Sequence, residues 1–164
     1  MRKSTYSIFF SFIFLLNTQS IFAQSSNCED LKKENEYLKK ALGILNPIKT
    51  VIVNKVDFNI AKCEGNIKEQ TIELTLILTN HAANNDISFR KAVAVDIEAN
   101  EYETYKINVG SSGSNNKIYT DVPVKTIIKF EKVLPSVKLL KIISIEFTGN
   151  NGGFEYKDIP VTWK

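Results

Sequence analysis

The stretch "TIELTLILT", residues 71–79, decides the fold of this chain. Its apolar residues, Ile72, Leu74, Leu76 and Leu78, recur at every second position, as they do in a β-strand with one buried face. The other face is polar and consists of Thr71, Glu73, Thr75 and Thr79. The pattern therefore predicts a half-buried strand.

Similar segments lie on both sides of this strand, and turn signals separate them. Alternating or apolar runs predict strands at 55–60, 87–99, 102–109, 118–133, 137–147 and 154–163. Strands without intervening helices cannot form a parallel crossover sheet, so the sheets should be largely antiparallel. Residues 47–164 are therefore expected to form an immunoglobulin-like or fibronectin-like β-sandwich of seven or eight strands. A small barrel is the alternative.

The alternation also predicts which side chains face inward. The expected inward sets are Ile87, Phe89, Val93, Val95 and Ile97; Tyr105, Ile107 and Val109; and Val122, Val124, Ile128 and Phe130. Pro123 cannot donate a ladder hydrogen bond, so its strand should lie at a sheet edge or begin near the proline. The run at 137–147 is apolar enough for a central strand, and "TGNNGG", residues 148–153, predicts a hairpin turn.

Three segments, "LTLILTN", "DVPVK" and "LKIISIEF", give the chain a resemblance to a known class. Their pattern across residues 49–164 resembles the small immunoglobulin-like domains of secreted bacterial proteins. The resemblance implies a β-sandwich outside the cytoplasm. It implies no particular activity and transfers no functional residue.

The N-terminus, residues 1–23, has the features of a secretory signal peptide. Arg2 and Lys3 are followed by the apolar run "IFFSFIFLL", and Ala23 is a small residue before the expected cleavage site. Polar residues 17–20 interrupt the run before it reaches the roughly 20 residues of a membrane span. Cys28 follows "SSN" rather than a lipoprotein box. We therefore expect a secreted or periplasmic protein that meets the membrane only through its signal peptide.

The charge of the chain does not favour a polyanionic partner. The formal net charge is +3, and it falls to +1 when the signal peptide leaves with its two basic residues. The lysines are spread along the chain rather than gathered in one segment. We therefore expect no nucleic-acid partner and no binding to an anionic membrane surface.

The segment 24–46 is predicted to be a short helix with a coiled-coil-like leucine face. In a heptad frame, Leu31, Leu38 and Leu45 fall at d, and Asn35 and Leu42 fall at a. An asparagine at a favours a parallel, in-register pair, so these five residues are the predicted dimerisation surface. Helices this short are marginal alone. Docking of the helix on its own domain and a loose spacer are the alternatives.

The chain has two cysteines, Cys28 and Cys63. In an oxidising compartment they could pair with each other. Cys28 also falls at a heptad a position, so it could instead pair with its copy in a second chain. Both disulfides are hypotheses, and two unpaired thiols are a third, less favoured option in such a compartment.

Catalytic and metal sites find little support in the sequence. His81 is the only histidine, and it lies in a predicted polar turn without a nucleophile motif nearby. One histidine and two separated cysteines do not make a zinc site. The acidic segment at 96–103 could offer calcium ligands, but Asp96 and Glu98 are better explained as a solvated strand face. We therefore expect no catalytic residue, no metal and no cofactor.

An aromatic platform is the remaining ligand-binding candidate in the sequence. It would use Tyr102, Tyr105, Tyr119 and Tyr156, although tyrosine is also common in ordinary strands. The expected function is a non-catalytic, secreted binding module for a protein or a glycan. The alternative is an oligomeric component of a cell-envelope assembly, dimerised through the helix, and a small hydrolase comes third.

Overall fold

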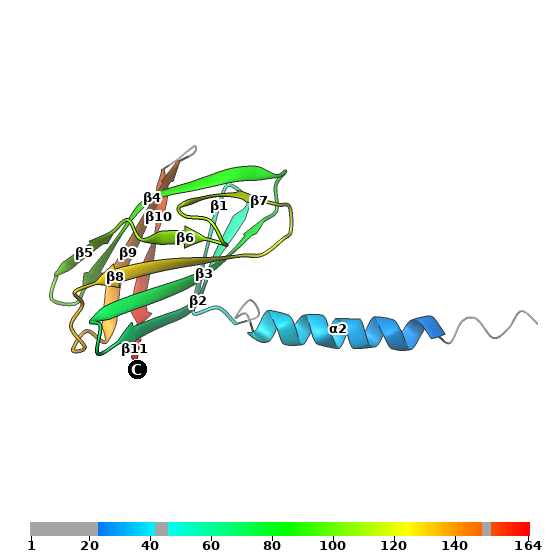
Figure 1. The fold of residues 1–164 in the computed structure, drawn as a ribbon, viewed down its shortest axis with the longest axis horizontal. Coiled ribbons are helices and arrows are strands. Elements are labelled where there is room, and N and C mark those ends of the chain that lie inside the picture. Colours follow the sequence, from blue (N-terminus) through cyan, green and yellow to red (C-terminus); the bar gives the residue numbers. More distant parts are fainter. Residues whose placement is uncertain (1–22, 42–45, 149–151) are drawn as a thin grey trace, which may run out of the picture. The chain divides into compact units, whose positions relative to one another are not determined.

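The computed structural model describes residues 23–41, 46–148 and 152–164 (Figure 1). These residues divide into two compact units, with the boundary between Lys39 and Lys40. The first unit contains helix α2, Ala23–Ala41, except for its last two residues, and the second contains all the strands. Most of the predicted helix is therefore helical, while Leu42 and Leu45 lie outside the described residues.

The β unit consists of two sheets. The first has the order β1 (Lys49–Val53), β2 (Val56–Asn66), β3 (Thr71–Asn80), β8 (Val124–Glu131) and β6 (Ile107–Val109). The second has the order β10 (Gly153–Pro160), β9 (Leu139–Thr148), β4 (Asn85–Asp96) and β5 (Glu101–Thr104). Strand β11 (Thr162–Trp163) pairs with β2, and β7 (Asn115–Ile118) pairs with β4.

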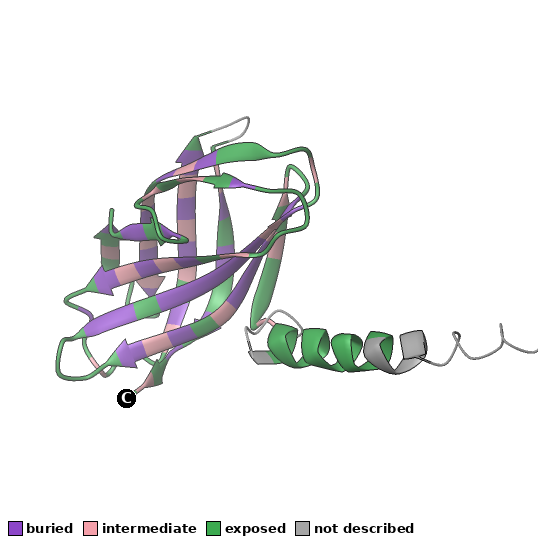
Figure 2. Cartoon of the chain, turned by 45° about the vertical axis from the view of Figure 1, so that its right-hand side comes forward, coloured by how far each residue is buried: buried purple, intermediate pink, exposed green. Residues whose placement is uncertain are grey.

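The mainly-β, antiparallel fold class predicted from the sequence is confirmed. The pairing of β11 with β2 is parallel, and the other strand pairings of the two sheets are antiparallel. Buried side chains from both sheets form one hydrophobic core, an arrangement that fits a β-sandwich. Figure 2 shows these buried residues as purple bands along the strands.

Strand β3 behaves as its sequence predicts. Its four predicted inward residues, Ile72, Leu74, Leu76 and Leu78, are at most 1% exposed. Full burial of each such side chain contributes about 1.5–3 kcal/mol to stability. On the opposite face Thr71 and Thr75 are also buried, whereas Glu73 is exposed.

The inward set predicted for β4 is wrong beyond Phe89. Ile87 and Phe89 are buried, but Ala92 and Ala94 are buried next, while Val93 and Val95 are only partly buried and Ile97 is exposed. The register with β9 shifts between Phe89 and Lys91, so Arg90 is the extra residue of a β-bulge. A bulge inserts one residue and reverses the alternation that follows it.

The single strand predicted at 102–109 is also wrong. The chain forms β5 in the second sheet and then β6 in the first, and it changes sheet at Tyr105 and Lys106. Thr104 fixes the crossing, since its hydroxyl donates to the Lys129 carbonyl at 2.7 Å and accepts the Lys106 amide at 3.1 Å. Tyr105 was expected to face inward with Ile107 and Val109, but it is 67% exposed.

The predictions from Pro123 and from the apolar run at 137–147 concern strands β8 and β9. Strand β8 begins at Val124, directly after Pro123, as one of the two predictions for that proline required. Val122 therefore lies before the strand and is exposed, contrary to its predicted inward position. Strand β9 is central, between β10 and β4, as predicted. The predicted turn between β9 and β10 includes residues 149–151, which lie outside the described residues.

Candidate functional site

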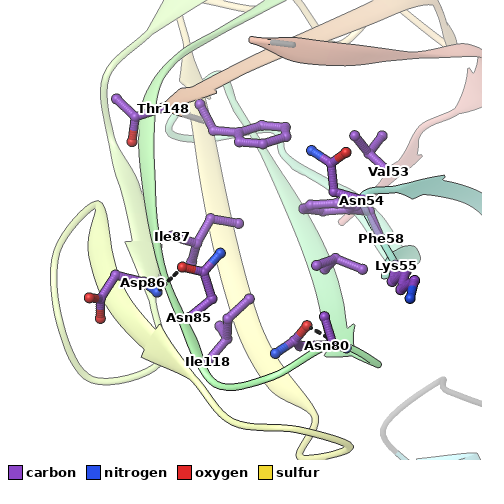
Figure 3. Close-up of a pocket in the computed structure, with 13 residues that line it drawn as sticks. Val53, Asn54, Lys55, Phe58, Asn80, Asn85, Asp86, Ile87, Ile118 and Thr148 are labelled. Carbon is purple, nitrogen blue, oxygen red and sulfur yellow. Dashed lines mark hydrogen bonds between the residues drawn. The ribbon is translucent and has the colours of Figure 1, made fainter. Parts of the chain in front are cut away.

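An open cavity, here called the end pocket, lies at one end of the sandwich (Figure 3). Its volume is about 510 Å³, within the range of pockets that hold small ligands. The floor is apolar and consists of Val56, Phe58, Ile87, Ile118 and Phe147. The rim comes from the β1–β2 turn, the end of β3, the loop that follows β3, and the ends of β1, β4 and β9. Its residues are Val53, Asn54, Lys55, Asn80, Ala82, Asn85, Asp86 and Thr148.

The floor of the end pocket is held by a cluster of aromatic rings. The Phe58 ring lies 4.4 Å from the Phe154 ring and 5.7 Å from the Phe147 ring, measured between centroids. Tyr156 packs against Phe154, and its hydroxyl donates to the Phe58 carbonyl at 2.9 Å. Burial raises the pKa of Tyr156, so this hydroxyl remains a donor. The floor is therefore apolar and packed against neighbouring aromatic rings.

The β1–β2 turn supplies one side of the rim. Val53 pairs with Val56, which leaves Asn54 and Lys55 as a two-residue hairpin loop with φ of 51° and 63°. Positive φ at both positions is the type I′ geometry that matches the twist of paired strands. The His81 amide donates to the Lys55 carbonyl at 2.8 Å. The turn is thus bonded to the loop that follows β3.

Internal hydrogen bonds order the loop after β3. The Asn80 side chain accepts the Ala82 amide and donates to the Ala83 carbonyl, both at 3.0 Å. Thr120 donates from its hydroxyl to the Ala82 carbonyl at 2.7 Å. Most polar groups of this rim are therefore paired within the protein, and the rim is formed before any ligand arrives.

His81 lies between two carboxylates beside this rim. Its Nδ1 is 2.7 Å from Asp121 Oδ1, and its Nε2 is 3.2 Å from Asp57 Oδ2. The hydrogen bond to Asp121, followed by that to Asp57, raises the pKa of His81. The two carboxylates contact opposite nitrogens of one ring, so the three groups do not converge on a point. The described residues contain no cluster of three or more potential metal ligands.

The sequence-based hypotheses for calcium and for an aromatic platform do not match the geometry. Asp96 was expected on a solvated face, but it is 3% exposed. Its carboxylate accepts hydrogen bonds from the Glu98 amide, from the amide and side chain of Asn100, and from the Tyr102 hydroxyl. These bonds close the β4–β5 turn and occupy the carboxylate. Tyr156 is buried in the core, so the four tyrosines do not form one surface.

The predicted cysteine and helix residues lie in different units. Cys28, Leu31, Asn35 and Leu38 are exposed on α2. Cys63 lies on β2 in the hydrophobic core, and burial raises the pKa of its thiol to about 12. Both cysteines are unpaired in this structure. The Cys28–Cys63 bridge within one chain and the Cys28–Cys28 bridge between two copies both stay predictions.

Comparisons with known proteins identify no relative of this chain. No protein-family model matches this chain, and no curated protein matches it. Within the part of the chain that the structure describes, no helix has the length and apolar character needed to span a membrane.

Proposed function

We propose that this protein is an exported, non-catalytic binding module that holds its ligand by an apolar group in the end pocket. The observation behind this proposal is the pocket itself, which combines an apolar aromatic floor with a rim already ordered by hydrogen bonds. Such a floor favours an apolar ligand group, such as a side chain of a protein ligand, over a bare glycan surface. Export is supported by the signal-like residues 1–23.

The environments of the reactive side chains support a non-catalytic role. A nucleophile activated by a base needs both groups within hydrogen-bond reach. Both ring nitrogens of His81 already face carboxylates. The Cys63 thiol is buried, and its pKa of about 12 keeps it protonated and unreactive.

Binding of an uncharged apolar dye tests this function. N-phenyl-1-naphthylamine gains fluorescence when it enters apolar surroundings, and we expect it to bind the chain from Gln24 to Lys164. Ala82→Phe places a ring at the pocket rim and should lower the dye affinity by about tenfold or more, because the ring occupies volume that the dye needs.

Ala83→Phe is the matched control, since Ala83 is the next residue of the same loop but does not line the pocket. It should bind the dye as the unaltered chain does. Absence of dye binding, or equal loss in both variants, would exclude the end pocket as the binding site.

A second candidate function is that of an assembly component dimerised through α2. The specific observation is the exposed leucine face of this helix, on which Leu31 and Leu38 are 59% and 50% exposed. Apolar side chains at heptad spacing are stabilised when a second helix covers them. The partner that we propose is a second copy of this chain.

We also propose that the sandwich belongs to the broad immunoglobulin-like class. The β unit has two largely antiparallel sheets and is about as long as a domain of this class, and both features support the proposal. The pairing of β2 with β3 differs from the constant-type immunoglobulin order, in which the second and third strands lie in different sheets. Many related sandwiches share the architecture without that strand order.

A further inference from the structure

The rim of the end pocket contains one cation, which lies beside the apolar floor. Lys55 lines the pocket from the second position of the β1–β2 turn. We propose that the ligand is an amphipathic anion, with an apolar chain or ring that fills the pocket and one carboxylate that binds the Lys55 ammonium group. This inference rests on the proposed function and names the chemical class of its ligand.

The acidic residues near Lys55 do not neutralise it. Asp57 is two residues away in the same hairpin, but its carboxylate is 3.2 Å from His81 Nε2. Asp86 also lines the pocket, yet its carboxylate points away from the other lining side chains (Figure 3). Within residues 46–148 and 152–164, Lys55 takes part in no salt bridge. The pocket lining therefore holds one cation, Lys55, without an ion-pair partner among these residues, and one anion, Asp86, whose carboxylate is turned outward.

The backbone fixes Lys55 at the rim of the pocket. Lys55 has a φ of 63°, and its carbonyl accepts the His81 amide at 2.8 Å. The left-handed conformation alone does not indicate a binding role, because Lys132 has a similar φ of 59° and lines none of the described pockets. What distinguishes Lys55 is the apolar cavity beside it.

The apolar floor and the Lys55 ammonium group each favour a different part of the ligand. The apolar floor excludes water and favours hydrocarbon. The ammonium group has three donors and no acceptor, so it favours a carboxylate through charge-assisted hydrogen bonds. A medium-chain fatty acid and an aryl-substituted carboxylic acid both combine these features at a size suited to the cavity.

Three eight-carbon probes that differ in their head group test the proposal. Octanoate, 1-octanol and octylammonium are titrated into isotopically labelled protein, residues 24–164, and amide shifts are followed by NMR. Octanoate should bind about fivefold more tightly than octanol, as expected for a partly solvated ion pair, and octylammonium should bind most weakly. The shifts should concentrate on the pocket residues Phe58, Ile87 and Thr148.

Variants at Lys55 assign the preference to this side chain. Lys55→Gln should remove the advantage of octanoate over octanol, and Lys55→Arg should keep it. Lys132→Gln, which changes a lysine of the same backbone conformation outside the pocket, should have no effect.

Equal affinities for octanoate and octanol, or a preference that survives Lys55→Gln, would overturn this inference while leaving the proposed function intact. Binding of none of the three probes, together with no dye binding, would exclude both.

Discussion

Thr126 places a hydroxyl group inside the hydrophobic core. It lies on β8 between Leu76 of β3 and Val109 of β6 and is fully buried. Among the buried side-chain atoms of the described residues, Thr126 Oγ1 has no hydrogen-bond partner. A buried hydroxyl without a partner costs about 1–3 kcal/mol of desolvation.

Replacing Thr126 by valine should therefore stabilise the protein. Thr126→Val keeps the branched shape and removes the unpaired oxygen, so we expect the free energy of unfolding to rise by about 1 kcal/mol. Urea denaturation measures the change.

The same substitution at Thr104 is the control. Thr104→Val removes a hydroxyl with two hydrogen bonds, so it should lower the free energy of unfolding by about 1–3 kcal/mol. If Thr126→Val also destabilises the protein, the Thr126 hydroxyl has a favourable interaction after all.

His81 should make stability depend on pH. Contacts with Asp121 and Asp57 raise its pKa above the ordinary 6.5 in the folded state. A raised folded pKa gives stabilisation that is fully present below pH 6.5 and is lost as the pH rises through the folded value. The stability difference between the unaltered protein and His81→Gln should therefore be larger at about pH 6 than at about pH 9.

The single histidine permits a direct measurement of this pKa by NMR. Asp121→Asn removes the largest cause of the shift and should bring the pKa of His81 back toward 6.5. Titration of the unaltered protein at or below pH 6.5 would contradict the bridging geometry.

At the scale of elements, the last strand depends on a glycine in the second. Trp163 on β11 pairs with Gly65 on β2, and its indole nitrogen donates to the Val137 carbonyl at 2.6 Å. A Cβ atom at Gly65 would overlap the Trp163 ring. The absence of a side chain at Gly65 is therefore what lets the ring lie on β2.

Gly65→Ala should displace this ring and destabilise the protein by about 1–3 kcal/mol, the usual cost of overpacking. Trp163 is the only tryptophan, so its emission should shift to the red as the ring meets water. Gly113→Ala is the control, because a Cβ there would meet no atom within 4 Å. Unchanged emission and stability in Gly65→Ala would show that Trp163 does not pack there in solution.

Helix α2 should control the oligomeric state. If its leucine face binds a second copy, residues 24–164 should sediment as a dimer, and Leu31→Ser with Leu38→Ser should give a monomer. Tyr37→Ser is the control, since Tyr37 is 71% exposed but falls outside the a and d positions. A monomeric unaltered chain at high micromolar concentration would end this proposal.

Across the whole molecule, alternation of apolar and polar residues predicts where strands occur better than it predicts which sheet a strand joins or which of its side chains are buried. The burial of Ile72, Leu74, Leu76 and Leu78 follows from their spacing alone. The bulge at Arg90 and the change of sheet at Tyr105 do not, because both depend on hydrogen bonds to strands distant in sequence. An alternating pattern has no local mark for either event. The bulge reversed the faces predicted for β4 beyond Phe89, and the change of sheet exposed Tyr105, while Ile107 and Val109 are buried as predicted.

The end pocket was not predictable for a related reason. Its rim joins side chains such as Lys55, Asn80 and Thr148, which no spacing rule brings together. The Asp57–His81–Asp121 contact likewise spans 24 and 40 residues. The one local signal was the Asn54–Lys55 pair between two β-branched runs, which is compatible with a tight hairpin turn. The helix over Ala23–Ala41, by contrast, could be predicted because its spacing pattern is local, and the role of its leucine face stays a prediction.

Strands β1 and β11 both pair with β2, on the edge opposite β3. Lys49 pairs with Ile60 and Trp163 pairs with Gly65, so the start of β1 and the end of β11 lie about 17 Å apart along β2. A linker of a few residues could join them, and a circular permutant opened at Gly113 should then keep the fold. The Val56 end of β2, which lines the end pocket, lies away from this junction. A second protein fused to either end of the β unit would thus leave the mouth of the pocket open.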